Sequence, residues 1–110
     1  MRQAFSGDDA AELEIKWHIR PDDEANGRGS GYVVDSLQSA VMLLTNDSYE
    51  KVVKAAIRLG NDTDTTACIA GGIAGLKWGE ESIPTRWLTA LRGRDMVEPL
   101  LVRLVDHIVR

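Results

Sequence analysis

The 110-residue sequence contains a single cysteine and no long apolar run. Cys68 cannot form a disulfide within the chain, and no group of Cys and His residues has the spacing of a zinc site. No stretch reaches the roughly 18 uninterrupted apolar residues of a membrane span, and the N-terminus lacks the apolar core of a secretion signal. We therefore expect a cytoplasmic protein that makes no membrane contact.

Basic residues are also in the minority, with 13 Lys and Arg against 17 Asp and Glu and a net charge of −4. Phosphates dominate the affinity for nucleic acids and demand a basic surface, so the acidic balance argues against a nucleic-acid partner. With 44% hydrophobic and 27% charged residues, the composition is that of a globular chain with one modest core.

Apolar residues recur at helical spacing along most of the chain, and no alternating strand pattern is present, which predicts an all-α fold. Residues 67–76 are apolar on nearly every side, which predicts a central, buried helix with Cys68 as a small buried hydrophobe. Asp35 or Ser36 is placed to cap a helix that ends near Thr45. The other predicted helices are 8–19, 48–59 with an end at Gly60, 85–91, and 96–108 with Pro99 in its first turn.

The densest cluster of polar side chains is Gly60-Asn61-Asp62-Thr63-Asp64-Thr65-Thr66, at a predicted helix N-terminus. Its carboxylate, amide and hydroxyl oxygens are hard ligands of the kind that Mg²⁺ prefers. The alternative is a helix cap, which explains one Asp but not the whole set. A calcium EF-hand is excluded, because the sixth and twelfth positions from Asp62 are Ala67 and Ile73 instead of Gly and Glu.

This cluster and the residues after it, up to Gly75, resemble the C-terminal signature of the ADP-ribosylglycohydrolases, similar to G-(G/N)-D-x-D-(T/S)-x-A-x-x-A-G-x-x-x-G. Two further stretches agree in order. Ser-Gly-Tyr-Val-Val-Asp-Ser-Leu at 30–37 resembles the family's substrate loop, and 81–88 resembles its (I/L)-P-x-x-W-L segment. The resemblance covers roughly residues 28–92 and points to the dinitrogenase-reductase-activating glycohydrolase type.

The resemblance implies a compact orthogonal helical bundle and a binuclear Mg²⁺ centre, in which Mn²⁺ can substitute. This centre would hydrolyse the glycosidic bond between ADP-ribose and an acceptor, so that ADP-ribose or an ADP-ribosylated substrate is the expected ligand. By resemblance, the metal ligands are Asp62, Asp64 and Thr65, whereas Thr63 and Thr66 match spacer positions and are interpreted as caps. The residues implied to bind substrate are Ser30, Gly31 and Tyr32, with the Tyr32 ring able to stack on a base or ribose.

Other elements of the family pattern have no counterpart here, namely a Thr-Asp-Asp cluster near the N-terminus, an early acid/base Glu and a glycine-rich diphosphate segment. We therefore assign no catalytic residue. We interpret 1–110 as a single partial domain, the C-terminal part of the fold, with a poorly regular N-terminal segment and Gly-rich loop at 1–31 and a helical core at 32–110. The alternatives are a noncatalytic or inactive interaction module, and a chain completed by a partner chain or by self-association.

Overall fold

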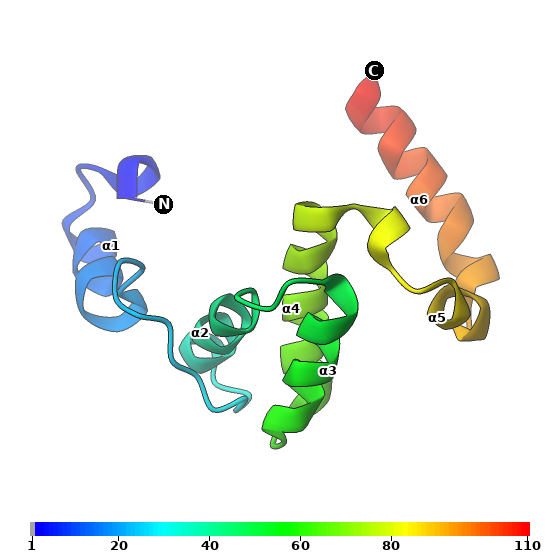
Figure 1. The fold of residues 1–110 in the computed structure, drawn as a ribbon. Coiled ribbons are helices and arrows are strands. Elements are labelled where there is room, and N and C mark those ends of the chain that lie inside the picture. Colours follow the sequence, from blue (N-terminus) through cyan, green and yellow to red (C-terminus); the bar gives the residue numbers. More distant parts are fainter. Residues whose placement is uncertain (1) are drawn as a thin grey trace.

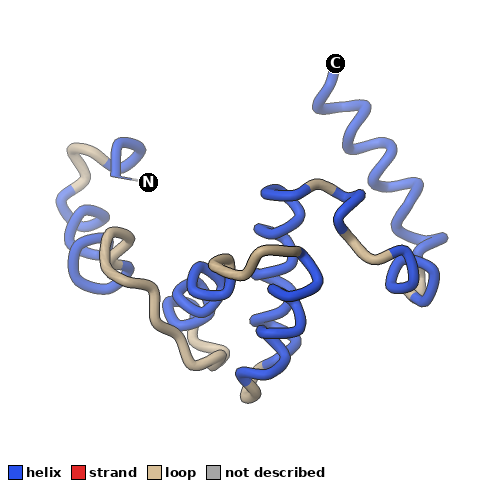
Figure 2. The backbone as a smooth tube through the Cα atoms, in the orientation of Figure 1, coloured by secondary structure: helices blue, strands red, loops and turns tan. Residues whose placement is uncertain are grey.

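The structure is a computed structural model that describes residues 2–110, and within that range all regular structure is helical, with no strand (Figure 2). The prediction of an all-α fold is confirmed. The longer helices are α2 (Val33–Leu43), α3 (Tyr49–Leu59), α4 (Thr63–Trp78) and α6 (Arg94–Val109). The shorter elements are η1 (Arg2–Phe5), α1 (Asp9–Glu14), the π-turn η2 (Ile15–Ile19), η3 (Glu80–Ser82) and α5 (Thr85–Ala90).

The packed core lies between α2, α3 and α4, with α4 in contact with both of the others (Figure 1). Its buried side chains are mostly small, which lets the helix backbones approach closely; they are Ala40, Leu43, Val52, Ala56, Ala70 and Ala74. Compact packing is confined to these three helices. The radius of gyration is 16.3 Å, whereas a compact domain of about 100 residues has roughly 13 Å.

The two ends of the chain extend to opposite sides of this core (Figure 1). The N-terminal elements lie beyond α2, and α6 stands apart beyond η3 and α5. α6 begins at Arg94, so Pro99 lies in its second turn and not in the first turn as expected. Within residues 2–110, no helix combines the length and the apolar character needed to span a bilayer.

Local signals determine where α3 begins and ends, as predicted, and where α4 begins; α4 extends beyond the predicted 67–76 at both ends. The Ser48 side chain accepts a hydrogen bond from Lys51 N at the start of α3. Gly60, with φ of 73°, ends α3, and Asp62 caps α4. The predicted end of α2 near Thr45 is confirmed, but the predicted cap at Asp35 or Ser36 is wrong, because Tyr32 is the N-cap residue and makes no side-chain hydrogen bond there.

The central position of α4 is confirmed, but its burial on every side is wrong. One face buries Thr66, Ala70 and Ala74, whereas Leu76 on the opposite face is 90% exposed. Cys68 lies on that open face and is exposed, so its prediction as a buried hydrophobe is also wrong. The physical reason is that α2 and α3 cover a single face of α4.

Candidate functional site

The glycine-rich loop lies against the N-terminus of α4, which is more than 30 residues away in sequence. Gly29 O accepts a hydrogen bond from Asp62 N at 2.9 Å, and Asn61 Nδ2 donates to Arg28 O at 2.8 Å. On its other side, Gly29 N donates to Ser39 Oγ of α2 at 3.0 Å. The loop is therefore fastened to both α2 and α4.

Asp35 organises the same loop from the first turn of α2. Its carboxylate accepts hydrogen bonds from Arg28 N at 2.9 Å, Ser30 N at 2.7 Å and Ser30 Oγ at 2.8 Å. Partial burial alone would raise the pKa of Asp35, but these hydrogen bonds and the Arg28 charge outweigh it and hold the pKa below its usual value. The Asp35 carboxylate therefore serves the loop as a charged acceptor.

Two glycines allow the loop to approach its neighbours. A Cβ on Gly27 would lie 2.4 Å from Ser39 N, and a Cβ on Gly31 would lie 2.5 Å from Asp62 Oδ2. At Gly27 the Ser39 backbone leaves no room for a larger residue, whereas at Gly31 only the Asp62 side chain would have to move. Gly31 therefore brings the loop backbone directly beside the Asp62 carboxylate.

The two aspartates of the polar cluster lie together at the N-terminus of α4. Thr65 N donates to Asp62 Oδ1 at 3.4 Å and to Asp64 Oδ1 at 2.9 Å. A hydrogen bond with the Asp64 side chain, supported by bonds from Thr65, lowers the pKa of Asp62. Both carboxylates thus reach the same helix end, where the macrodipole favours negative charge.

The surface beside these residues forms a shallow hollow lined by Asp64, Thr65, Cys68 and Ile69. Two neighbouring carboxylates and a hydroxyl give a donor set of hard oxygens, which fits Mg²⁺ or Mn²⁺. Within residues 2–110, no group of three or more His, Cys, Asp and Glu side chains is placed to hold a metal ion. The residues present therefore fit part of a metal site.

The two threonines interpreted as caps do not have the same surroundings. Thr63 is the first residue of α4. Thr66 is fully buried, and its hydroxyl has no hydrogen-bond partner within the described part of the chain. The interpretation of both threonines as caps is wrong, because Asp62 is the N-cap residue of α4.

The residues implied to bind substrate fall into two groups. Ser30 and Gly31 lie in the fastened loop, and Gly31 faces Asp62. Tyr32 is 63% exposed at the start of α2, so its ring is accessible. Sequence reasoning missed Ser39, and it counted Asn61 only as an oxygen donor of the polar cluster, whereas both side chains hold the loop.

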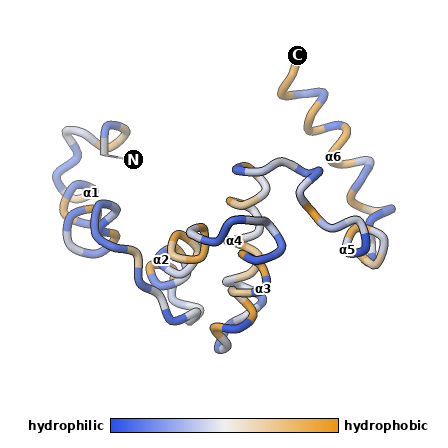
Figure 3. Tube along the Cα trace, viewed as in Figure 1, coloured by the Kyte–Doolittle hydropathy of each residue, from blue (hydrophilic) through white to orange (hydrophobic). Residues whose placement is uncertain are grey.

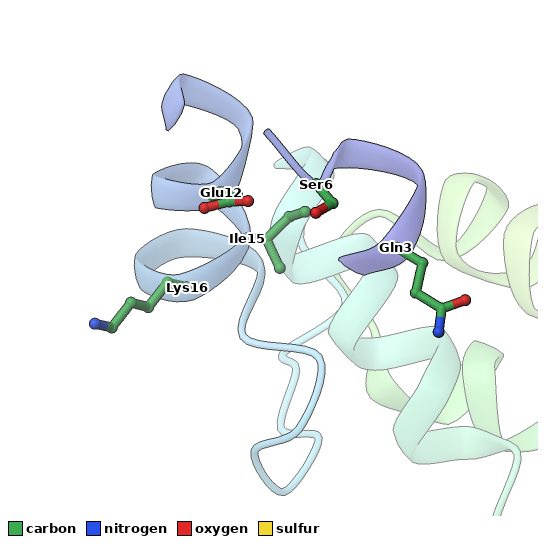
Figure 4. A pocket seen from close by; sticks show the side chains of 5 residues that line it. All are labelled: Gln3, Ser6, Glu12, Ile15 and Lys16. Atoms are coloured by element: carbon green, nitrogen blue, oxygen red, sulfur yellow. The ribbon is translucent and has the colours of Figure 1, made fainter. Parts of the chain in front are cut away.

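A second hollow lies at the far N-terminal end, between η1 and α1 (Figure 4). It is lined by Gln3, Ser6, Glu12, Ile15 and Lys16. Glu12 already accepts a hydrogen bond from Gly7 N at 3.0 Å, and Lys16 extends away from the other side chains (Figure 4). This hollow therefore offers no converging set of reactive groups.

Comparisons with known proteins identify a matching family and several relatives of this chain. The family model described as ADP-ribosylglycohydrolase matches residues 2–110. The chain is 36% identical over 78 residues to ADP-ribosylarginine hydrolase Tri1 of Serratia proteamaculans, covering 70% of this chain and 21% of the relative. It is 34% identical over 95 residues to the ADP-ribosyl-(dinitrogen reductase) glycohydrolase of Rhodospirillum rubrum, covering 84% and 30%.

A vertebrate relative matches a shorter stretch. The chain is 44% identical over 57 residues to ADP-ribosylhydrolase ARH3 of Danio rerio, covering 52% of this chain and 15% of the relative. The matches thus span between 15% and 30% of the length of these three relatives. No solved structure matches the chain.

Proposed function

Because the chain belongs to the ADP-ribosylglycohydrolase family, we propose that it takes part in the hydrolysis of the glycosidic bond between ADP-ribose and an acceptor. Its part is to supply the C-terminal half of a binuclear Mg²⁺ site, with ADP-ribose or an ADP-ribosylated molecule as the ligand. The relatives named ADP-ribosylarginine hydrolase and ADP-ribosyl-(dinitrogen reductase) glycohydrolase support this class of reaction.

The observation that carries the proposal is the meeting of the loop and the acidic cluster. The Asp62 backbone N–H is bonded to Gly29 O, and the Asp62 side chain lies against Gly31. Any molecule held by the loop would therefore lie beside the two carboxylates. This proximity is what a reaction on a bound ADP-ribose group requires, because positioning supplies much of the rate enhancement.

The groups that would hold the ions are the Asp62 and Asp64 carboxylates and the Thr65 hydroxyl. When bound, Mg²⁺ or Mn²⁺ supplies Lewis-acid chemistry, which orients substrate oxygens and makes a water molecule more acidic. The Asp62 carboxylate suits this role because it is a hard, anionic oxygen donor of the kind that Mg²⁺ prefers. Gly31 leaves Asp62 Oδ2 without a side chain in front of it.

The loop residues would bind and orient the substrate. Asp35 holds the Ser30 backbone and hydroxyl in place, so Ser30 and Gly31 are presented on a rigid support. The exposed Tyr32 ring next to them offers an apolar face with a polar tip, as stacking on a base or ribose needs.

Calorimetric titration of the 110-residue chain with Mn²⁺, followed by ADP-ribose, tests this proposal directly. We expect binding of both, and loss of Mn²⁺ binding in Asp62→Asn combined with Asp64→Asn. The matched control is Asp95→Asn, because Asp95 is also an acid in the first turn of a long helix, α6. Equal Mn²⁺ affinity in the double variant and the control would contradict the assignment.

Activity is tested in a chimera, since the chain spans only part of its relatives. The matched residues of the Rhodospirillum rubrum relative are replaced by this chain, and release of ADP-ribose is measured. We expect release that is abolished by the paired Asp62→Asn and Asp64→Asn substitutions. Retained release in that variant would overturn the roles given to the two carboxylates.

A second candidate function is a noncatalytic helical module that acts by association. The exposed apolar side chains of α6 favour it. The same titration separates the two, because a module would bind neither Mn²⁺ nor ADP-ribose.

A further inference from the structure

α6 carries a continuous apolar face that is open to solvent. We call it the apolar stripe; it consists of Val97, Leu100, Leu101, Leu104, Val105 and Ile108. These residues recur at spacings of three and four, so they share one side of the helix. Each is between 48% and 71% exposed. Charged residues lie on the other side, including Asp95, Arg103 and Asp106.

The rest of the chain, as far as the structure describes it, leaves this face open. None of the residues of α6 is buried. Where α6 comes closest to η3, a hollow remains, lined by Glu80 of η3 together with Leu101 and Val105. Figure 3 shows the apolar residues running along a helix that stands away from the core.

The comparisons indicate what belongs on this face. The family match runs to Arg110, so α6 is part of the family's domain and not an appendage to it. More than two thirds of the Rhodospirillum rubrum relative has no counterpart in this chain. Because a one-sided apolar helix in a globular domain normally faces other helices, the portion of the relative's domain that has no counterpart in this chain is the natural occupant.

We propose that the apolar stripe of α6 is a docking surface for the portion of an ADP-ribosylglycohydrolase domain that has no counterpart in this chain. This inference depends on family membership and not on the proposed activity. Complex formation therefore tests this inference, and the metal titration tests the proposed function separately.

The charges of α6 argue against a lipid surface as the occupant. Helices that lie on membranes are rich in Lys and Arg on their polar face. α6 instead balances Arg94, Arg103 and Arg110 with Asp95, Glu98 and Asp106. Two of the acids pair with basic residues on the helix itself, Glu98 with Arg94 and Asp106 with Arg110.

The test co-expresses this chain with the Rhodospirillum rubrum relative from which the matched residues have been deleted. We expect a one-to-one complex on size exclusion and slower amide hydrogen exchange along α6 than in the isolated chain. Leu100→Glu combined with Leu104→Glu should reduce recovery of the complex at least tenfold, because it places two charges in the surface that the complex would bury. Arg103→Glu is the matched control and should leave recovery unchanged, since it introduces the same residue on the polar side.

Three outcomes would overturn the proposal. They are failure of the two chains to co-purify, equal recovery with the double variant, and a self-associated form of this chain alone that the double variant disrupts. The last would assign the stripe to a second copy. If the deleted relative is insoluble, the single-chain chimera replaces it. A chimera that does not fold cooperatively, or whose α6 exchanges as fast as in the isolated chain, also contradicts the proposal.

Discussion

Gly31 and Asp62 lie so close together that a methyl group on Gly31 would come within 2.5 Å of Asp62 Oδ2. Two whole helices, α2 and α3, lie between these residues in the sequence. The loop backbone nevertheless lies directly beside the Asp62 carboxylate. The absence of a side chain at position 31 therefore determines where that carboxylate can lie. A glycine singled out as a substrate contact also has a role in placing a proposed metal ligand.

Gly31→Ala should weaken Mn²⁺ binding without unfolding the core. The added methyl must displace either the Asp62 carboxylate or the loop, and changes next to a metal ligand typically cost roughly tenfold or more in affinity. Calorimetric titration measures the change. The control is Gly75→Ala, where a Cβ meets open space within a helix. Unchanged Mn²⁺ affinity in Gly31→Ala would show that Asp62 does not bind the ion from this position.

Asp35→Asn should destabilise the chain at neutral pH and have no effect in strong acid. A carboxyl whose pKa is lowered by folding contributes stability above its unfolded pKa of about 3.9. That contribution is lost as the pH falls through the lowered folded pKa, because the protonated carboxyl accepts the Arg28 and Ser30 hydrogen bonds poorly. Urea unfolding at several pH values measures it, with Asp95→Asn as the control. A difference between Asp35→Asn and the native chain that persists unchanged at pH 2 would contradict this account.

Thr66→Val should raise the free energy of unfolding by about 1 kcal/mol, because it replaces a buried, unpartnered hydroxyl with a methyl of the same shape. Chemical denaturation of both chains measures the difference. Thr89→Val is a suitable comparison, since Thr89 is exposed and its hydroxyl donates to Thr85 O at 3.0 Å. A large loss of stability in Thr66→Val would mean that its hydroxyl has a partner after all.

Cys68 should react with a thiol reagent in the folded chain within about tenfold of its rate in urea, because the side chain is exposed. The matched control combines Cys68→Ser with Ala70→Cys, which moves the thiol to the buried face of the same helix. That thiol should react far more slowly, since it becomes accessible only when the structure opens. Similar rates for the two thiols would show that the faces of α4 are not distinguished as described.

Features with local physical causes could be predicted from the sequence. The start and end of α3 follow from Ser48 and Gly60, and the start of α4 follows from Asp62, because their effects act within one helical turn. The cluster of Asp62, Asp64 and Thr65 could be found because its donors are adjacent in sequence. The role of Asp35 could not, since its hydrogen bonds run backward to Arg28 and Ser30 across a loop of unknown shape.

Neighbouring residues are enough to indicate that the chain is helical, where most of its helices lie and which family it belongs to, because periodicity, caps and motifs are all local in the sequence. The packing of distant segments was needed to show that the loop meets Asp62 through Gly29 and Gly31, and that α4 and α6 each leave one face open. An apolar helix requires a partner, but its sequence does not say whether that partner is present. Burial depends on how the helices pack together, and within residues 2–110 no other segment covers Cys68, Leu76 or the apolar stripe.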